Sequence, residues 1–206
     1  MWNTTDNVRL RGLQRLRGWL TARPFAAAVA SSVSVAILAA ASAGFAGARL
    51  NTTPSTPYGI YWVRDMPFAT GNYVTFCPPA DRAEFALATA RGYLPQGRCA
   101  GGTSPMLKKI VAGPGDTVAI DQRGVHVNGR LLSGSRPLRR DAKSRPMPVL
   151  NMAGRRLGAD EVLLLSDAHA YSFDGRYFGP LPRSSLQHVV VPWFTWRAPS
   201  AHSESN

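Results

Sequence analysis

Apolar residues are arranged differently in the first fifty residues and in the rest of the chain. Residues 25–48 contain no charged side chain, and about 20 predominantly apolar residues are enough for a helix to cross a bilayer. After residue 50 the apolar residues fall into short β-branched or aromatic runs bounded by Gly, Pro, Asn or Asp, as is typical of strands. The pattern predicts a single transmembrane helix followed by a mainly β, antiparallel domain.

The individual runs predict most of the strands. They are GIYWV, NYVTF, LKKIVA, DTVAI, VHVNGRLL, EVLLLS and HVVVPWFTW. Asn128-Gly129 lies within the fifth run and is the strongest short signal for a hairpin. One short helical excursion is predicted in PPADRAEFALATARGYL, with Asp81 as N-cap, Glu84 three residues later and Gly92 as the stop.

These patterns divide the chain into four parts. Residues 1–23 form a basic, amphipathic leader, 24–49 the membrane anchor and 50–198 the β domain, and the polar residues 199–206 are expected to be a disordered tail. Within the β domain, residues 133–158 are basic, contain proline and show little periodicity. This segment is predicted to be a variable, mobile surface insertion.

The charge distribution bears on location and partners. Lys and Arg together number 24 against 12 Asp and Glu, an excess that suits an anionic membrane surface, nucleic acid or a solvated basic face. The basic residues are not interleaved with aromatic ones, which argues against nucleic acid as a partner. Arginines precede the apolar run, so we expect a cytoplasmic N-terminus and an exported β domain, periplasmic in a Gram-negative bacterium.

The apolar run also allows a second interpretation. It ends in small residues, AGFAGA, spaced as at a signal-peptide cleavage site. A secretory apolar region is usually about 7–15 residues long, shorter than this one, which favours an uncleaved anchor in the inner membrane. Both interpretations export the same domain.

The cysteines and histidines carry limited information. Cys77 and Cys99 are the two cysteines, and export predicts a disulfide between them; two unrelated buried thiols are the alternative. The histidines are scattered without the spacing of metal ligands, so we expect structural or surface roles for them, and neither a metal nor a cofactor. They are His126, His169, His188 and His202.

The first stretch with candidate chemistry is NTTPSTPYGIYWV, directly after the apolar run. Pro54 and Pro57 restrict the backbone around Ser55, which would present its hydroxyl at a defined angle. Thr53 supplies a second hydroxyl with the same parity in an extended chain. A serine nucleophile needs a base within hydrogen-bond reach, and without one this stretch would be a proline-rich stalk.

The second stretch, MLKKIVAGPGDTV, supplies a candidate base. Alternation in a strand places Lys108 and Lys109 on opposite faces, so that one of them points toward the apolar side. Burial lowers the pKa of a lysine, and a neutral lysine can act as a general base. The alternative is an edge strand protected by lysines.

The third stretch is LLLSDAHAYSFDGRYFGP. Ser172, Asp174 and Arg176 share a parity, so in a strand they would line one face, with Asp174 and Arg176 able to pair. Ser172 could then orient a nearby amine. The alternative is a hairpin with a surface ion pair, which contributes little to stability.

Taken in order, the three stretches resemble the type I signal peptidase family of Ser/Lys proteases. The pattern S-x-P-x-G-x-Y, formed here by Ser55, Pro57, Gly59 and Tyr61, is similar to the conjugative-transfer, TraF-type branch of that family. The cysteine pair that flanks a helix also fits this branch. The likeness extends in patches over residues 51–196 and leaves 133–158 unmatched.

The resemblance implies a role for each motif residue. Ser55 matches the nucleophile and Lys108 the general base, and the Ser55 N–H with the Thr53 hydroxyl matches the oxyanion hole. Ser172 matches the serine that orients the lysine. Asp174 and Arg176 match the supporting ion pair. The chain departs from the family at Ser166-Asp167-Ala168, where the family has G-D-N.

The function expected from this resemblance is that of a membrane-anchored serine endopeptidase acting through an acyl-enzyme. Its expected partner is an exported propilin or another precursor protein, cut after a small residue during conjugative transfer and, in some systems, cyclised. Other transfer-apparatus proteins are possible partners. The alternatives are a general signal peptidase of broad specificity and a non-catalytic, anchored assembly protein of a transfer apparatus.

Overall fold

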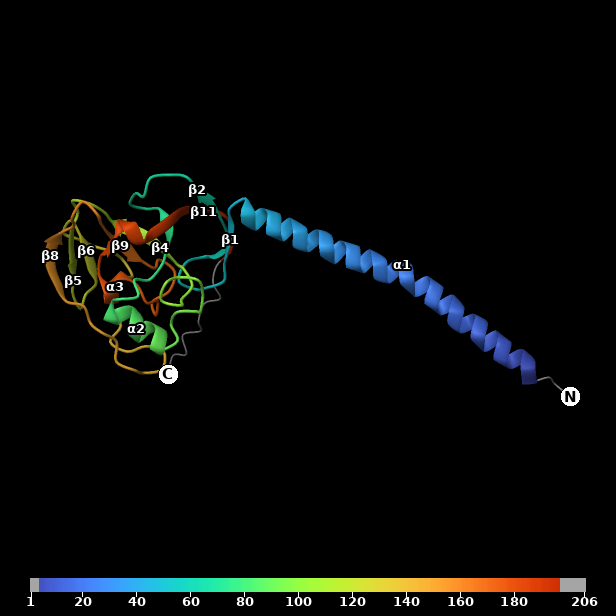
Figure 1. Cartoon of the computed structure of the whole chain (residues 1–206). Helices are drawn as coiled ribbons and strands as arrows, with labels where there is room; N and C mark the ends of the chain where they lie inside the picture. The colour runs from blue at the N-terminus through green and yellow to red at the C-terminus, as the bar shows by residue number, and fades with distance from the viewer. Residues whose placement is uncertain (1–3, 197–206) are drawn as a thin grey trace. The chain divides into compact units, whose positions relative to one another are not determined.

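The computed structural model describes residues 4–196, with side chains from residue 24 onward, and divides into two units. The first unit ends at Gly47 and consists of one helix, α1 (Thr4–Phe45), drawn in blue in Figure 1. Its segment Pro24–Phe45 has 22 residues and a mean hydropathy of 1.9, so by length and composition it can cross a membrane. A signal sequence passes the same test, so both interpretations of the apolar run remain. The predicted tail 199–206 and His202 lie outside the described residues.

The second unit begins at Ala48 and is built on two antiparallel sheets. In the larger sheet the strand order is β1-β2-β11-β3-β4-β9-β10, and in the smaller it is β7-β6-β5-β8. The strands of the larger sheet are β1 (Ala48–Asn51), β2 (Tyr58–Arg64), β3 (Tyr73–Phe76), β4 (Met106–Ala112), β9 (Glu161–Leu165), β10 (Leu181–Pro182) and β11 (Leu186–Trp196). Those of the smaller sheet are β5 (Thr117–Ile120), β6 (Val125–Val127), β7 (Arg130–Leu131) and β8 (Met152–Arg156). The predicted mainly β, antiparallel domain is confirmed, and each predicted run contains a strand.

The hairpin between β6 and β7 turns at the predicted Asn128-Gly129 pair. Both residues have positive φ, 51° and 79°, which is what the favoured two-residue hairpin turn requires. The side chain of Asn128 also accepts a hydrogen bond from the backbone N–H of Thr117 at 2.8 Å. The turn residues therefore tie this hairpin to the start of β5.

The segment 133–158 is integrated into the fold to a greater extent than its sequence predicts. It contributes β8, which pairs with β5, and it buries Ser135, Met147 and Leu157. The β8 sequence MAGRR has no β-branched residue and is mostly exposed, so it lacks the pattern by which strands are recognised. The segment predicted to be a variable, mobile surface insertion thus contains one strand that is paired into the smaller sheet.

Helix α2 (Ala83–Ala90) confirms the predicted helical excursion but begins differently. Arg82, not Asp81, is the N-cap, and no side chain caps the helix. The guanidinium of Arg82 donates to Glu84 at 3.2 Å and to the carbonyl of Phe178, which ties the start of the helix to a distant part of the chain. The predicted stop is confirmed, since Gly92 follows the C-cap with φ of 74°.

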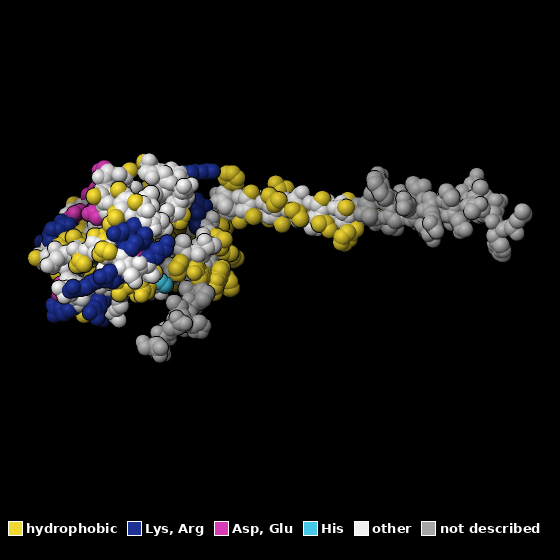
Figure 2. All heavy atoms as spheres, turned by 90° about the horizontal axis from the view of Figure 1, so that it is seen from below, with side chains coloured by type: hydrophobic (Ala, Val, Ile, Leu, Met, Phe, Trp, Pro, Cys, Tyr) yellow, Lys and Arg dark blue, Asp and Glu magenta, His cyan; other side chains and the backbone are white. Residues whose placement is uncertain are grey.

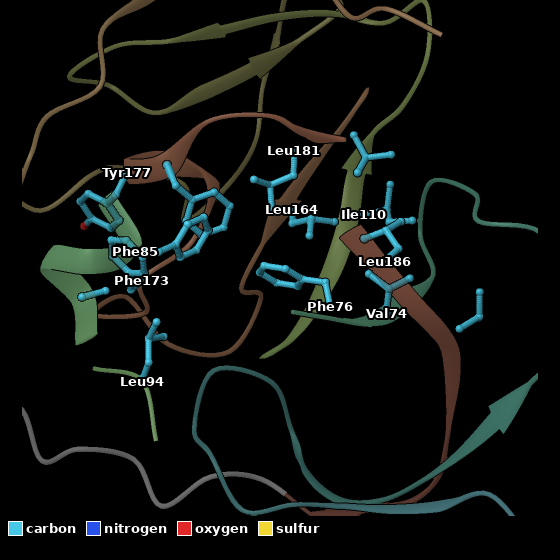
Figure 3. Packing of buried hydrophobic residues seen from close by; sticks show 14 of the residues in the cluster. Val74, Phe76, Phe85, Leu94, Ile110, Leu164, Phe173, Tyr177, Leu181 and Leu186 are labelled. Carbon is cyan, nitrogen blue, oxygen red and sulfur yellow. The ribbon is translucent and has the colours of Figure 1, made fainter. Parts of the chain in front are cut away.

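Two apolar clusters hold the second unit together. The larger lies between α2 and the seven-stranded sheet, and Figure 3 shows Phe85 of α2 close to Phe173 and Tyr177. The ring centroids of Phe85 and Phe178 are 4.9 Å apart. The smaller cluster includes Val118 and joins the four-stranded sheet to β4 and β9. Phe178 belongs to a short helix, α3 (Gly175–Phe178), so the core fixes both α2 and the segment that holds the third candidate stretch.

Candidate active site

Ser55 lies in the turn that joins β1 to β2. The two strands pair up to Asn51 and Gly59, so that the intervening residues form a tight loop at the end of the larger sheet. Gly59 allows a close approach here, because a Cβ on it would lie 2.2 Å from the carbonyl oxygen of Phe194 in β11. Ser55 is half-buried. The sheet therefore holds both ends of the loop that carries the predicted nucleophile.

Asn51 organises the interior of this loop. Its side-chain amide donates to the hydroxyl and carbonyl of Thr56 at 2.9 and 3.1 Å and to the carbonyl of Pro57 at 3.0 Å. Its side-chain oxygen accepts from the backbone N–H of Thr53 at 3.1 Å and from the Thr53 hydroxyl at 2.7 Å. Sequence analysis missed this residue, although an Asn before such a turn is a recognised turn-forming signal. Asn51 is 7% exposed, which makes it a buried hub of the loop.

The bond from Thr53 to Asn51 also settles the direction of a second contact. The Oγ atoms of Thr53 and Ser55 are 3.3 Å apart. An amide oxygen only accepts, so the Thr53 hydroxyl donates to Asn51 and Ser55 is the donor toward Thr53. Any role of Thr53 in an oxyanion hole requires its hydroxyl to rotate from Asn51 toward the substrate.

Lys108 and Lys109 lie on opposite faces of β4, as alternation predicts. β4 lies between β3 and β9, so the alternative of an edge strand protected by lysines is wrong. Lys109 is partly exposed, 3.5 Å from Asp167. Lys108 is 2% exposed, and burial lowers the pKa of its amine to about 8, an effect that the nearby carboxylate of Asp174 opposes. An amine in this state is neutral far more often at physiological pH than a surface lysine.

Ser172, Asp174 and Arg176 do not form the predicted strand. Asp174 is the N-cap of α3, and its Oδ1 accepts from the backbone N–H of Arg176 at 3.1 Å. The carboxylate and the Arg176 guanidinium form a fully buried, two-pronged ion pair with distances of 2.8 and 2.9 Å. The alternative of a surface ion pair is therefore wrong. The guanidinium also donates to the carbonyl of Ser172 at 3.0 Å and so fixes the backbone there.

Ser166 links this buried ion pair to the Ser55 loop. Its backbone N–H donates to Oδ2 of Asp174 at 2.9 Å, and its hydroxyl donates to the backbone carbonyl of Ser55. The hydroxyl stands where the resembled family has a glycine. The serine at position 166, which departs from the family pattern, thus makes a direct contact with Ser55.

One cavity of about 760 Å³ brings the candidate residues together. Thr53, Ser55, Lys108 and Ser172 all line it, whereas Asp174 and Arg176 do not. Two of the four histidines, His169 and His188, also line it, so they are the natural controls for any assignment of the base. His126 lies elsewhere, 3.5 Å from Asp121. Across residues 24–196 no three His, Cys, Asp or Glu side chains gather as metal ligands would.

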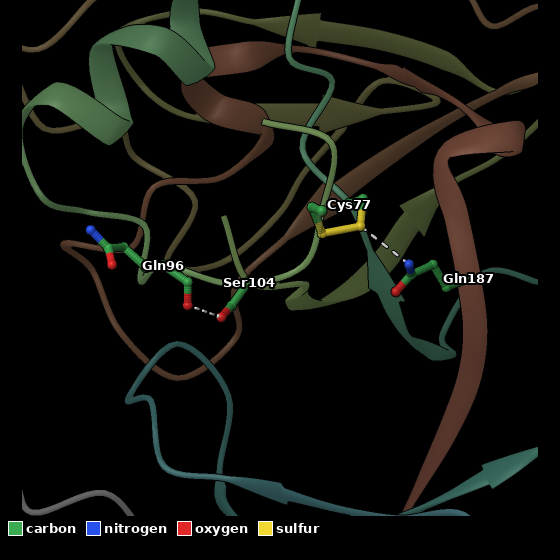
Figure 4. The surroundings of a disulfide bond; sticks show 5 residues. Cys77, Gln96, Ser104 and Gln187 are labelled. Carbon is green, nitrogen blue, oxygen red and sulfur yellow. Dashed lines mark hydrogen bonds between the residues drawn. A yellow bond between two sulfur atoms is a disulfide. The ribbon is translucent and has the colours of Figure 1, made fainter. Parts of the chain in front are cut away.

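The Cys77–Cys99 disulfide is confirmed and lies near one wall of this cavity. It closes the segment that contains α2, and Figure 4 shows Gln187 of β11 donating to the Cys77 sulfur at 3.1 Å. Tyr93, Leu94 and Pro95, just before Cys99, line the cavity. The bond therefore restrains a segment that shapes the site.

Comparison with known proteins identifies the family. The family model described as "Signal peptidase, peptidase S26" matches residues 17–194. The chain belongs to the signal peptidase S26 family. The resemblance that the sequence motifs indicated is thus confirmed.

Several relatives are similar along most of this S26-family chain. A "Plasmid transfer protein TraF" from Escherichia coli is 46% identical over 171 residues, covering 83% of this chain and 96% of the relative. A "Conjugal transfer protein TraF" from Agrobacterium tumefaciens is 40% identical over 163 residues, covering 78% and 89%. Among solved structures, a signal peptidase I from Enterococcus faecalis aligns with a TM-score of 0.36 and 16% identity, covering 61% of this chain and 98% of that one.

Proposed function

We propose that this protein is a membrane-anchored serine endopeptidase that matures exported precursor proteins in conjugative transfer. Membership of the signal peptidase family supports the activity, and the names of the TraF relatives support the setting. The helix Pro24–Phe45 supplies the anchor, with the N-terminus in the cytoplasm and the β domain in the periplasm. The disulfide supports this orientation, since such bonds persist in oxidising compartments.

The observation that carries the proposed mechanism is that a buried lysine and a half-buried serine line the same cavity. Neutral Lys108 takes the proton from Ser55 as the Ser55 oxygen attacks the scissile carbonyl. The Ser55 N–H and the rotated Thr53 hydroxyl receive the oxyanion. Lys108 then returns the proton to the leaving amine, and an acyl-enzyme remains on Ser55. Attack by water, or by the amino group of the precursor itself, releases a linear or a cyclic product.

In this proposal the Asp174–Arg176 pair and Ser172 do not touch the reacting atoms; they act on Lys108. The carboxylate of Asp174 favours protonation of Lys108 and the guanidinium of Arg176 opposes it. Burial is the larger influence, so the amine stays readily deprotonated. Ser172 lines the cavity and offers a hydroxyl that can orient the lysine.

The substrate in this proposal is a pilin-like precursor that passes the anchor in the same membrane. The cavity is within the range of about 300–1,000 Å³ typical of ligand sites, and its lining is largely apolar, which suits a short extended peptide with small side chains. Main-chain pairing along a strand edge would hold such a peptide.

The test uses the full-length protein in detergent micelles with a purified TraF-system propilin, analysed by mass spectrometry. We expect cleavage, or a product lighter by one water when the chain is cyclised. Ser55→Ala and Lys108→Met should abolish it, whereas the matched control Lys109→Met, one residue away on the other face of β4, should retain it. Cleavage that survives both Ser55→Ala and Lys108→Met would contradict the proposed dyad. No cleavage by the parent protein would favour an anchored assembly protein, and equal processing of generic secretory precursors would favour a general signal peptidase.

A further inference from the structure

A loop within residues 133–158 is held in a defined conformation by one carboxylate. Oδ1 of Asp141 accepts from the backbone N–H groups of Lys143 and Arg145, both at 2.9 Å. Its Oδ2 accepts from Nε of Arg145 at 2.6 Å and from the hydroxyl of Tyr93. The side chain of Asp141 is 9% exposed. The loop is therefore built around Asp141 and fastened to the segment that precedes Cys99.

This loop encloses a second cavity with a strongly basic lining. The cavity measures about 220 Å³, and four cationic side chains line it together with the single carboxylate of Asp141. The four cations are Arg91, Arg140, Lys143 and Arg145. Asp141 already pairs with Arg145, and among the described residues no second carboxylate lines the cavity. Arg91 and Arg140 each donate one bond to a backbone carbonyl, which leaves their charge and that of Lys143 uncompensated by the lining. Figure 2 shows that Lys and Arg side chains also predominate over Asp and Glu on the face of this unit that it presents.

The basic cavity adjoins the candidate active site. Tyr93 and Tyr171 line both cavities. Their chain neighbours Leu94 and Ser172 line the larger one. A peptide that occupies the larger cavity and extends past the two tyrosines would bring its next residues to the basic lining.

We propose that this basic cavity is a substrate subsite that binds a carboxylate of the precursor close to the scissile bond. This inference rests on the peptidase function proposed above. Guanidinium groups match a carboxylate in charge and geometry, and such charge-assisted bonds are stronger than neutral ones. The volume lies below the range of about 300–1,000 Å³ for drug-sized ligands, which suits one acidic side chain or a chain end. The carboxylate belongs either to a Glu or Asp side chain or to the C-terminus of the precursor.

Binding tests the subsite without requiring cleavage. Neutral, alanine-rich peptides with an uncharged dye carry one Glu or one Gln at successive positions and end in a carboxylate or an amide. Their affinity for full-length Ser55→Ala protein in micelles is measured by fluorescence anisotropy at about 0.15 M salt, where distant surface charges are largely screened. We expect at least one peptide with a carboxylate to bind about tenfold more tightly than its neutral counterpart, or about 1.4 kcal/mol.

A charge-matched pair of variants locates the effect. The double variant Arg140→Gln/Lys143→Gln removes two exposed cations of the subsite, and Arg98→Gln/Arg130→Gln removes two exposed cations that line neither cavity. We expect the first to abolish the carboxylate preference and the second to keep it. A preference that follows the Glu position assigns the subsite to a side chain, and one that follows the terminal carboxylate assigns it to the chain end.

Three outcomes would overturn the inference. One is the absence of any carboxylate preference, and another is equal loss of the preference in both double variants. The third is a carboxylate preference that the subsite variant keeps, while this variant alone loses binding to vesicles of anionic phospholipid. The cavity would then bind a lipid headgroup and not the peptide. Cleavage of the same peptides by the Ser55 protein is scored separately, so failure of the subsite and failure of the peptidase function give different results.

Discussion

The pH dependence of peptide cleavage should report the buried state of Lys108. With a pKa of about 8, about 9% of this amine is neutral at pH 7, against about 0.03% for a lysine at 10.5. The fold therefore raises the supply of the base at neutral pH about 300-fold. We expect the single-turnover rate to rise about fifty-fold between pH 6 and pH 8 and to level off above pH 8.5.

The assay is single-turnover cleavage of an internally quenched peptide by the full-length protein in micelles, from pH 5.5 to 10.5. A rate that continues to rise tenfold per pH unit through pH 10 would show an unperturbed lysine and refute the role of burial. A midpoint near pH 6.5 that disappears in His169→Gln or His188→Gln would assign the base to a histidine of the cavity. Lys109→Met should leave the midpoint unchanged.

Burial of Lys108 has a matching cost in stability. Because the folded-state pKa lies below the unfolded one, the unfolded chain binds more protons between about pH 8 and 10.5, so the free energy of unfolding rises with pH across that window. Below pH 8 the cost is complete, about 3 kcal/mol. Lys108→Met, which the proposed mechanism expects to be inactive, should therefore melt at a higher temperature than the parent at pH 7, with a difference that shrinks toward pH 10.5. A lower melting temperature at pH 7 would contradict this.

Three further variants test the architecture of the site. Asn51→Ala removes the hydrogen bonds that the Asn51 side chain makes to Thr53, Thr56 and Pro57, so we expect kcat to fall at least tenfold with KM changed less, measured by steady-state cleavage. An unchanged kcat would show that the loop keeps its shape without Asn51. Replacing Cys77 and Cys99 by Ala should lower the free energy of unfolding by about 3 kcal/mol for a closed segment of this length, measured by denaturant titration, and a loss below 1 kcal/mol would contradict the estimate. Arg176→Met leaves the carboxylate of Asp174 buried without its partner and should cost about 3–5 kcal/mol, whereas a neutral effect in the same titration would mean that water reaches the carboxylate.

The sequence was sufficient to predict residues whose role follows from local periodicity. Alternation alone placed Lys108 and Lys109 on opposite faces. The Asn128-Gly129 pair predicted the hairpin between β6 and β7. The pattern failed where long-range contacts decide the structure. Asp81 has the chemistry of an N-cap, but the N-cap is Arg82, one residue later, and its guanidinium bonds the distant Phe178 carbonyl, a contact that no local pattern describes.

The third stretch failed for a related reason. The parity of Asp174 and Arg176 suits a strand, but the carboxylate caps α3 and receives the backbone N–H of Ser166 from the end of β9. Asn51 was missed because its six bonds are made within a loop whose shape no periodic pattern describes. The sequence thus pointed to the candidate reactive groups more readily than to the groups that hold them in place.

The short connection between α1 and β1 limits where the proposed enzyme can act. α1 ends at Phe45, β1 begins at Ala48, and Ser55 follows ten residues after the helix end. A chain advances at most about 3.3–3.6 Å per residue, so Ser55 cannot lie farther than roughly 35 Å along the backbone from that end. Four of the ten residues are fixed by pairing with β2, so little of this connection is free to move. Under the proposed function, a precursor must be cut while it is still beside the bilayer, and a precursor that has diffused away would escape processing.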